Sequence, residues 1–160
     1  ASATKLSSET FPMGEIVRFE FPARGPLPPV TLTWYDGGLK PPRPAELDAD
    51  DVMRDVIYIG DKGKMMGERL IPESRMEGYR RPAKTLTRSP GHYQEWINAC
   101  RGGAPAGANF PDHAGLLTEV CLLGNAAVRA QKKLLWDGPN LRITNDTAAN
   151  KLLHREYRAG

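Results

Sequence analysis

The sequence predicts an α+β fold, a largely antiparallel β-sheet with helices packed on one face. Strand patterns fill the first half of the chain and helical patterns the second, an order typical of this class. Neighbouring strand patterns are joined by short loops, which favours antiparallel pairing. The length of 160 residues fits a single domain covering residues 1–160.

Two strands are predicted near the N-terminus, EIVRFEF at 15–21 and VTLTWYD at 30–36. Both are rich in β-branched and aromatic residues, and Pro22 ends the first. Alternation puts the apolar side chains of the first strand on one face of the sheet. The opposite face is expected to hold a mixed polar set, Arg18, Glu20, Thr31 and Thr33.

A second hairpin is predicted at 55–67, where DVIYIGDKGKMMG has a tight turn at Asp61-Lys62-Gly63. The segment from Asp36, DGGLKPPRPAEL, is rich in glycine and proline and predicts a stiff, shaped loop. Residues 68–90 show no clean period and are expected to be mostly loop.

Helices are predicted in the second half, at 92–101, 112–132 and 147–157. Ser89 is expected to cap the first and Gly102-Gly103 to end it; Asn145 or Asp146 should cap the last. Short strands are expected at KLLWD and LRIT between the second and third helices. The stripe predicted to bury the second helix comprises Leu116, Leu117, Val120, Leu123, Ala127 and Ala130.

The stretch GHYQEWINACRGG, residues 91–103, has the residue types of an active site but the spacing of a helix core. Tyr93, Trp96, Ile97 and Cys100 share one helical face and are expected to be buried. His92 lies at the helix start, where it is free to face a cleft. The alternative is that it is an ordinary surface or capping residue. No nucleophile–base set is indicated by the spacing.

Trp34, Tyr35 and Asp36, at a predicted strand end before two glycines, form a candidate binding site. Aromatic side chains beside a flexible loop suit sugar stacking or an interface. The alternative is that they belong to the aromatic core and a turn.

Several classes of site have no sequence signal. The net charge of +3 does not argue for nucleic acid, and no apolar run is long enough to span a membrane. There is no Cys/His pair at zinc spacing and no glycine-rich nucleotide loop between a strand and a helix. Cys100 and Cys121 are expected to be reduced and buried on helix faces. The compartment, cytoplasmic or periplasmic, is left open.

The chain from about Glu9 to Arg158 resembles the C-terminal region of bacterial Gfo/Idh/MocA oxidoreductases. The resemblance depends on segments in this order: RFEFPARGPLPPVTLTWYDGGLKPPRP, IGDKGKMMG, RLIP, RSPGHYQEWINACRGGAPAGANF, LLTEVCLLGNAAVR, KLLWD and ANKLLHREYR. The combination of WYDGG, HYQEW with its glycine loop, and LLGN is more specific than any one of them.

The resemblance implies the substrate-binding and oligomerisation domain of an NAD(P)-dependent oxidoreductase that acts on a sugar or polyol derivative. The Rossmann half, the Glu-Lys-Pro motif and the Asp…His pair of the family have no match here. The chain is therefore expected to be a fragment that is inactive alone. It would have no catalytic, cofactor-binding or metal residues of its own, while NAD or NADP would bind the full-length parent.

For this chain the resemblance adds Arg88, His92 and Tyr93 as candidate walls of a substrate pocket, beside Trp34, Tyr35 and Asp36. It also implies a homo-oligomer formed through the open sheet face. Two alternatives are a non-enzymatic sheet domain for assembly or binding, and part of an NAD-dependent glycoside-cleaving enzyme. The partners expected are thus a second copy and a small sugar or polyol, with no nucleic acid and no membrane.

Overall fold

A computed structural model describes residues 1–54 and 56–158. It divides into two compact units, the sheet–helix unit of Ala1–Lys40 with Ser89–Gly160 and the hairpin unit of Pro41–Arg88. The described residues form antiparallel sheets and two α-helices, which confirms the α+β class. The strands make three small sheets, however, and not one large sheet. Long segments rich in proline and glycine separate the strand pairs, and proline cannot continue a hydrogen-bonded ladder.

The first sheet has the order β1-β2-β3, with β1 at Ser2–Ala3, β2 at Glu15–Phe21 and β3 at Val30–Tyr35. β2 and β3 pair antiparallel as predicted, with Val17 opposite Trp34 and Arg18 opposite Thr33. Directly opposed residues share a face. The sheet therefore has an apolar face of Val17, Phe19, Phe21, Val30, Leu32 and Trp34, and an open face of Ile16, Arg18, Glu20, Thr31, Thr33 and Tyr35.

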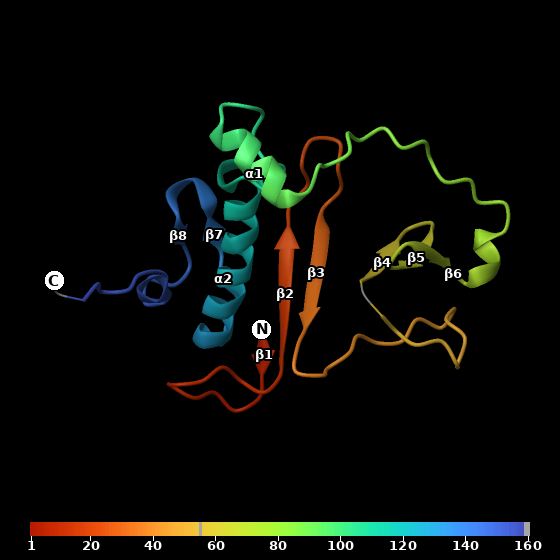
Figure 1. Cartoon of the computed structure of the whole chain (residues 1–160). Helices are drawn as coiled ribbons and strands as arrows, with labels where there is room; N and C mark the ends of the chain where they lie inside the picture. The colour runs from red at the N-terminus through yellow and green to blue at the C-terminus, as the bar shows by residue number, and fades with distance from the viewer. Residues whose placement is uncertain (55, 159–160) are drawn as a thin grey trace. The chain divides into compact units, whose positions relative to one another are not determined.

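α2 (Gly115–Ala130) covers the apolar face over β2, and β3 is the strand farther from this helix (Figure 1). The contact is close because Gly124 has no side chain: a Cβ there would lie 2.9 Å from Cζ of Phe19. Val17 and Val128 are buried at this contact. The predicted stripe is wrong. Leu116 and Leu117 are exposed and its other four members are only half-buried, whereas the buried residues of the helix are Gly124, Ala126 and Val128.

The start of α2 differs from the prediction. A π-helical turn, η2 (Phe110–Ala114), precedes it, and Oδ1 of Asn109 accepts a hydrogen bond from the Asp112 amide at 2.9 Å. Asn109 thus begins this helical segment where the sequence predicted a start at Asp112.

α1 (His92–Cys100) has nearly the predicted bounds. Gly102, at a φ of 83°, ends it as predicted. The predicted Ser89 cap is wrong: the N-cap residue is Gly91, no side chain caps the helix, and the Ser89 hydroxyl accepts from the Gly91 amide at 3.0 Å. Its predicted burial is wrong: Tyr93 is 75% exposed and Trp96 65%. Helical spacing predicts an apolar face, but no strand or helix among the described residues of this unit covers that face.

Cys100 and Cys121 are both exposed free thiols, so the predicted burial of the cysteines is wrong. We now expect both to react quickly with a maleimide or disulfide reagent in the native protein, because access limits thiol reactions. Mass spectrometry of native and urea-unfolded samples measures this. Labelling that is complete only in urea would contradict the exposed positions.

The C-terminal part of the sheet–helix unit contains β7 (Trp136–Asp137), η3 (Gly138–Asn140), β8 (Arg142–Ile143) and η4 (Ala149–Leu153). β7 and β8 are shorter than the predicted strands. The predicted helix at 147–157 is only the short 3-10 helix η4, and residues 154–158 are not helical. The N-cap residue of η4 is Ala148 and not Asn145 or Asp146, although Oδ1 of Asp146 accepts from the amides of Ala148 and Ala149 just before and at the start of η4.

The hairpin unit contains β4 (Ile57–Gly60), β5 (Gly63–Met66), β6 (Arg69–Ile71) and the 3-10 helix η1 (Glu73–Met76). β4 and β5 confirm the predicted hairpin, although its first residue, Asp55, is outside the described residues. β6 pairs with β5, so the prediction that residues 68–90 are mostly loop missed a strand. A three-residue strand is too short to show a period.

No helix in the described part of the chain has the length and apolar character needed to cross a membrane.

Candidate functional site

The first candidate cluster lies at the end of β3. The indole of Trp34 is on the apolar face and 58% exposed, whereas Tyr35 is half-buried on the open face opposite Ile16. The Asp36 amide donates to the Glu15 carbonyl at 3.0 Å, and its Oδ1 accepts from the Gly37 amide at 2.7 Å. The Asp36 carboxylate therefore shapes the turn, and Trp34 is the group of this cluster available for stacking.

The second candidate cluster lies at the start of α1. The rings of His92 and Tyr93 are 4.1 Å apart and tilted by 43°, and both residues are exposed. Glu95 joins this helix start to the following loop, since its Oε2 accepts from the Gly107 amide at 3.0 Å. Hydrogen bonding to Ser89 and then to Gly107 holds the pKa of Glu95 below its usual range. Glu95 thus positions the helix, and an aromatic pair is what α1 offers to a ligand.

Within the sheet–helix unit, the structure does not bring the candidate residues into one site. Within the sheet–helix unit, α1 lies at the end of the hairpin where β2 finishes, and Trp34, Tyr35 and Asp36 lie at the other end (Figure 1). Arg88 is exposed. It is the last residue of the hairpin unit, whereas the other candidate residues belong to the sheet–helix unit. Their roles in substrate binding stay predictions.

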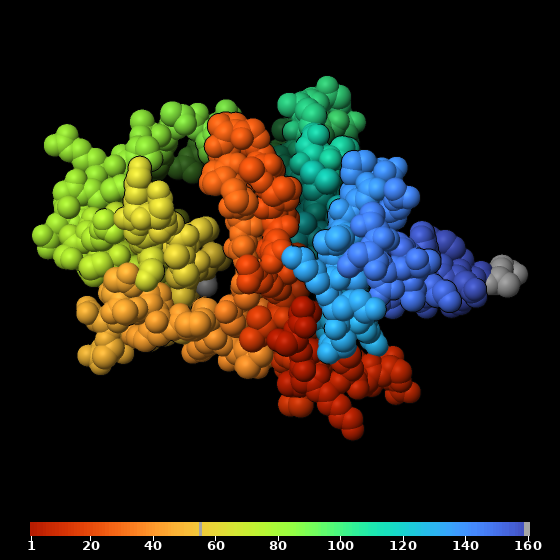
Figure 2. All heavy atoms as spheres, turned by 180° about the vertical axis from the view of Figure 1, so that it is seen from behind, coloured from red at the N-terminus to blue at the C-terminus, as the bar shows by residue number. Residues whose placement is uncertain are grey.

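Sequence reasoning missed a groove at the C-terminal end of α2. Its volume is about 420 Å³, and Phe11, Leu122, Arg129 and Leu152 are among its lining residues. Figure 2 shows the N-terminal residues (red) near the C-terminal segment (blue) on this unit. The Arg129 guanidinium lies 5.5 Å from the centre of the Phe11 ring and donates to the Ser7 carbonyl. The lining residues are far apart in the sequence, so no local pattern predicts them.

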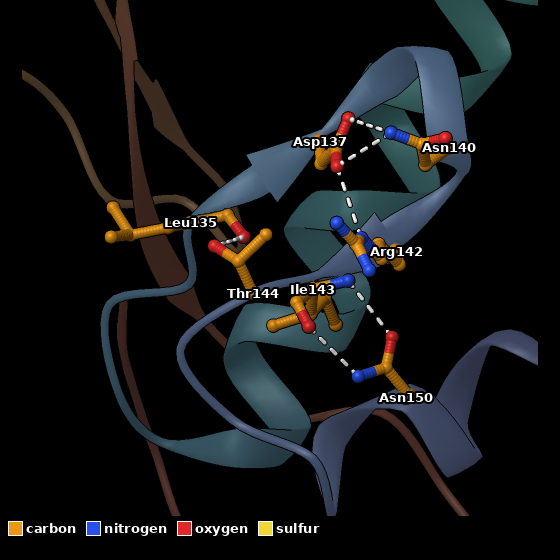
Figure 3. A network of polar contacts seen from close by, with 7 residues as sticks. All are labelled: Leu135, Asp137, Asn140, Arg142, Ile143, Thr144 and Asn150. Atoms are coloured by element: carbon orange, nitrogen blue, oxygen red, sulfur yellow. Dashed lines mark hydrogen bonds and ion pairs between the residues drawn. The ribbon is translucent and has the colours of Figure 1, made fainter.

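A polar network that joins β7, β8 and η4 was also missed (Figure 3). The Asp137 carboxylate accepts from Nδ2 of Asn140 and from Nε of Arg142, the latter at 3.0 Å. These two partners, Asn140 first, lower the pKa of Asp137. Asn150 uses both ends of its amide on the backbone of Ile143, at 2.8 Å each. The network satisfies backbone groups of a short hairpin and is a structural device.

The described residues contain no group of three or more His, Cys, Asp or Glu side chains placed to hold a metal ion. What the two candidate clusters offer to a ligand is aromatic surface and hydrogen-bonding groups.

Neither the protein-family models nor the curated proteins searched include a match to this chain.

Proposed function

We propose that this chain is the substrate-binding and oligomerisation domain of an NAD(P)-dependent oxidoreductase that acts on a sugar or polyol derivative, and that it is inactive alone. The proposal rests on the sequence resemblance together with one structural observation. On the β2–β3 hairpin, α2 packs on one face, over β2, and does not pack on the other face. A domain of the expected kind needs this division, because its helices take one sheet face and its assembly contacts the other.

The binding role is best supported by Trp34. An exposed indole at a strand end offers a flat apolar surface, and the apolar C–H face of a sugar ring stacks on such a surface. His92 and Tyr93 offer a second aromatic surface with polar atoms for hydroxyl groups. Neither cluster supplies a hydride acceptor, so the chemistry is assigned to a cofactor held by the rest of the parent protein.

The assembly role is assigned to the open face. Its centre carries threonines and one exposed ion pair, Arg18 with Glu20 at 3.4 Å, and Lys133 also pairs with Glu20. These partners, Lys133 first, lower the pKa of Glu20. Exposed pairs of this kind contribute little to stability, and β-branched side chains beside them are able to pack against a partner sheet.

We expect the chain by itself to bind neither NAD(H) nor NADP(H) appreciably. The reason is that it has no glycine-rich turn between a strand and a helix, which is the element that receives a dinucleotide pyrophosphate. Isothermal titration calorimetry with each cofactor measures this. Micromolar affinity in a monodisperse sample would overturn the assignment of the cofactor to the rest of the parent.

A further inference from the structure

β3 is an edge strand of its sheet and carries no protective residue of its own. It is the last strand in the order β1-β2-β3, and no other strand in the described part of the chain pairs with its outer side. Its sequence, VTLTWY, contains no charge, proline or glycine. Native proteins ordinarily guard a free edge with lysine, proline, a bulge or a covering element.

The hydrogen-bond pattern shows which backbone groups point outward. The Asp36 amide donates to the Glu15 carbonyl, and these two residues are in register, so they form a hydrogen-bonded pair of the β2–β3 ladder. Such pairs alternate along an antiparallel ladder. Leu32 and Trp34 therefore bond to β2, whereas the N–H and C=O groups of Thr31, Thr33 and Tyr35 point away from it.

The outward edge is complementary to a second copy of itself. In an antiparallel pair centred on Leu32, Thr31 lies opposite Thr33 of the other copy, and both have outward N–H and C=O groups. The same register puts Val30 opposite Trp34, and both lie on the apolar face. β-branched residues opposite aromatic ones, and threonine opposite threonine, are favourable cross-strand pairs.

The side chains that this pairing would cover are exposed. Val30 is 49% exposed, Leu32 42% and Trp34 58%, although all three lie on the face that α2 covers over β2. The α2 contact ends at β2, so this apolar strip has no cover from its own unit.

We propose that two copies of this chain associate edge to edge through antiparallel pairing of β3, which joins two three-stranded sheets into one. The contact is two-fold symmetric, because the pairing is reciprocal: Val30 of each copy lies opposite Trp34 of the other, and Thr31 of each lies opposite Thr33. It uses the backbone edge and the apolar strip, and so is a different surface from the open face assigned to assembly above.

Thr33→Pro tests the edge directly. Proline removes the outward N–H of Thr33 and leaves the β2–β3 hydrogen bonds, which use Leu32 and Trp34, in place. Sedimentation equilibrium is expected to show that the dimer dissociation constant rises at least about tenfold, given the hydrogen bonds lost. Thr33→Ala is the matched control: it changes the same side chain on the open face but keeps the N–H. It loses only the Thr31–Thr33 side-chain pairs and is expected to weaken the dimer less than Thr33→Pro does.

Amide hydrogen exchange of the wild-type chain gives an answer that does not depend on any variant folding. The amides of Leu32 and Trp34 are protected by β2 in every state and serve as internal references. Edge pairing predicts that the amides of Thr31 and Thr33 become protected as the concentration rises. Fast exchange at Thr31 and Thr33 in hundreds of micromolar protein would overturn the proposal, whether the sample is a monomer or a dimer. A Thr33→Pro chain that folds and dimerises like the wild type would do the same.

Discussion

Replacing Gly37 with alanine is expected to lower the free energy of unfolding of the sheet–helix unit by about 3 kcal/mol. Gly37 has a φ of 66°, in the left-handed region that disfavours a side chain. A Cβ there would lie 1.9 Å from the Met13 carbonyl oxygen and 2.4 Å from Cα of Gly14. These are backbone atoms that no rotamer change relieves, so the loop has to move and to pull on the start of β2.

Gly38 provides the control for this substitution. It has a φ of 80°, but a Cβ there meets no atom within 4 Å. Gly38→Ala is therefore expected to lower the free energy of unfolding only by the strain of a side chain in the left-handed region, about 1–2 kcal/mol. Urea unfolding followed by tryptophan fluorescence compares the two variants. Equal losses would show that the close approach at Gly37 is not part of the folded protein.

Gly124→Leu is expected to separate α2 from β2, with a loss of about 3 kcal/mol from overpacking. A Cβ at this position lies 2.9 Å from Cζ of Phe19 and 3.6 Å from Cγ1 of Val17. The Phe19 ring can move enough for one carbon atom but not for a whole leucine side chain. Leucine forms helices better than glycine by less than about 1 kcal/mol. The clash is larger, so the net change is a loss of stability.

Cys121→Leu is the matched control for Gly124→Leu. Cys121 is on the same helix but exposed, so the same new side chain is expected to change stability by less than about 0.5 kcal/mol. Urea unfolding of both variants tests the helix–sheet contact. A Gly124→Leu chain as stable as Cys121→Leu would mean that α2 does not pack on β2 through Gly124.

Local patterns predicted the elements well where side-chain period and turn residues agree. EIVRFEF became β2 with the predicted bounds, and the β4–β5 hairpin followed its turn. The last predicted helix is wrong in length, since only η4 forms there. Asp146 accepts from the amides of Ala148 and Ala149, but such a contact near a helix start does not decide how far the helix continues.

Burial was harder to predict than secondary structure. The amphipathic pattern of α1 is real, yet Tyr93 and Trp96 are exposed, because periodicity says which side chains share a face and not whether another element covers it. The relative positions of the candidate site residues were equally hard to predict. Trp34 and His92 were chosen from local context, and only the three-dimensional arrangement shows that they lie at opposite ends of one hairpin.

The most direct test of the proposed function is a nicotinamide-reduction assay on this chain, with and without the polypeptide encoded immediately upstream in its gene. A panel of sugars and polyols is offered with NAD or NADP, and the absorbance of the reduced cofactor is followed. The proposal predicts no turnover by the chain alone and turnover of at least one sugar or polyol by the longer polypeptide. Turnover by the chain alone, or an upstream polypeptide that binds no dinucleotide and gives no turnover, would contradict it.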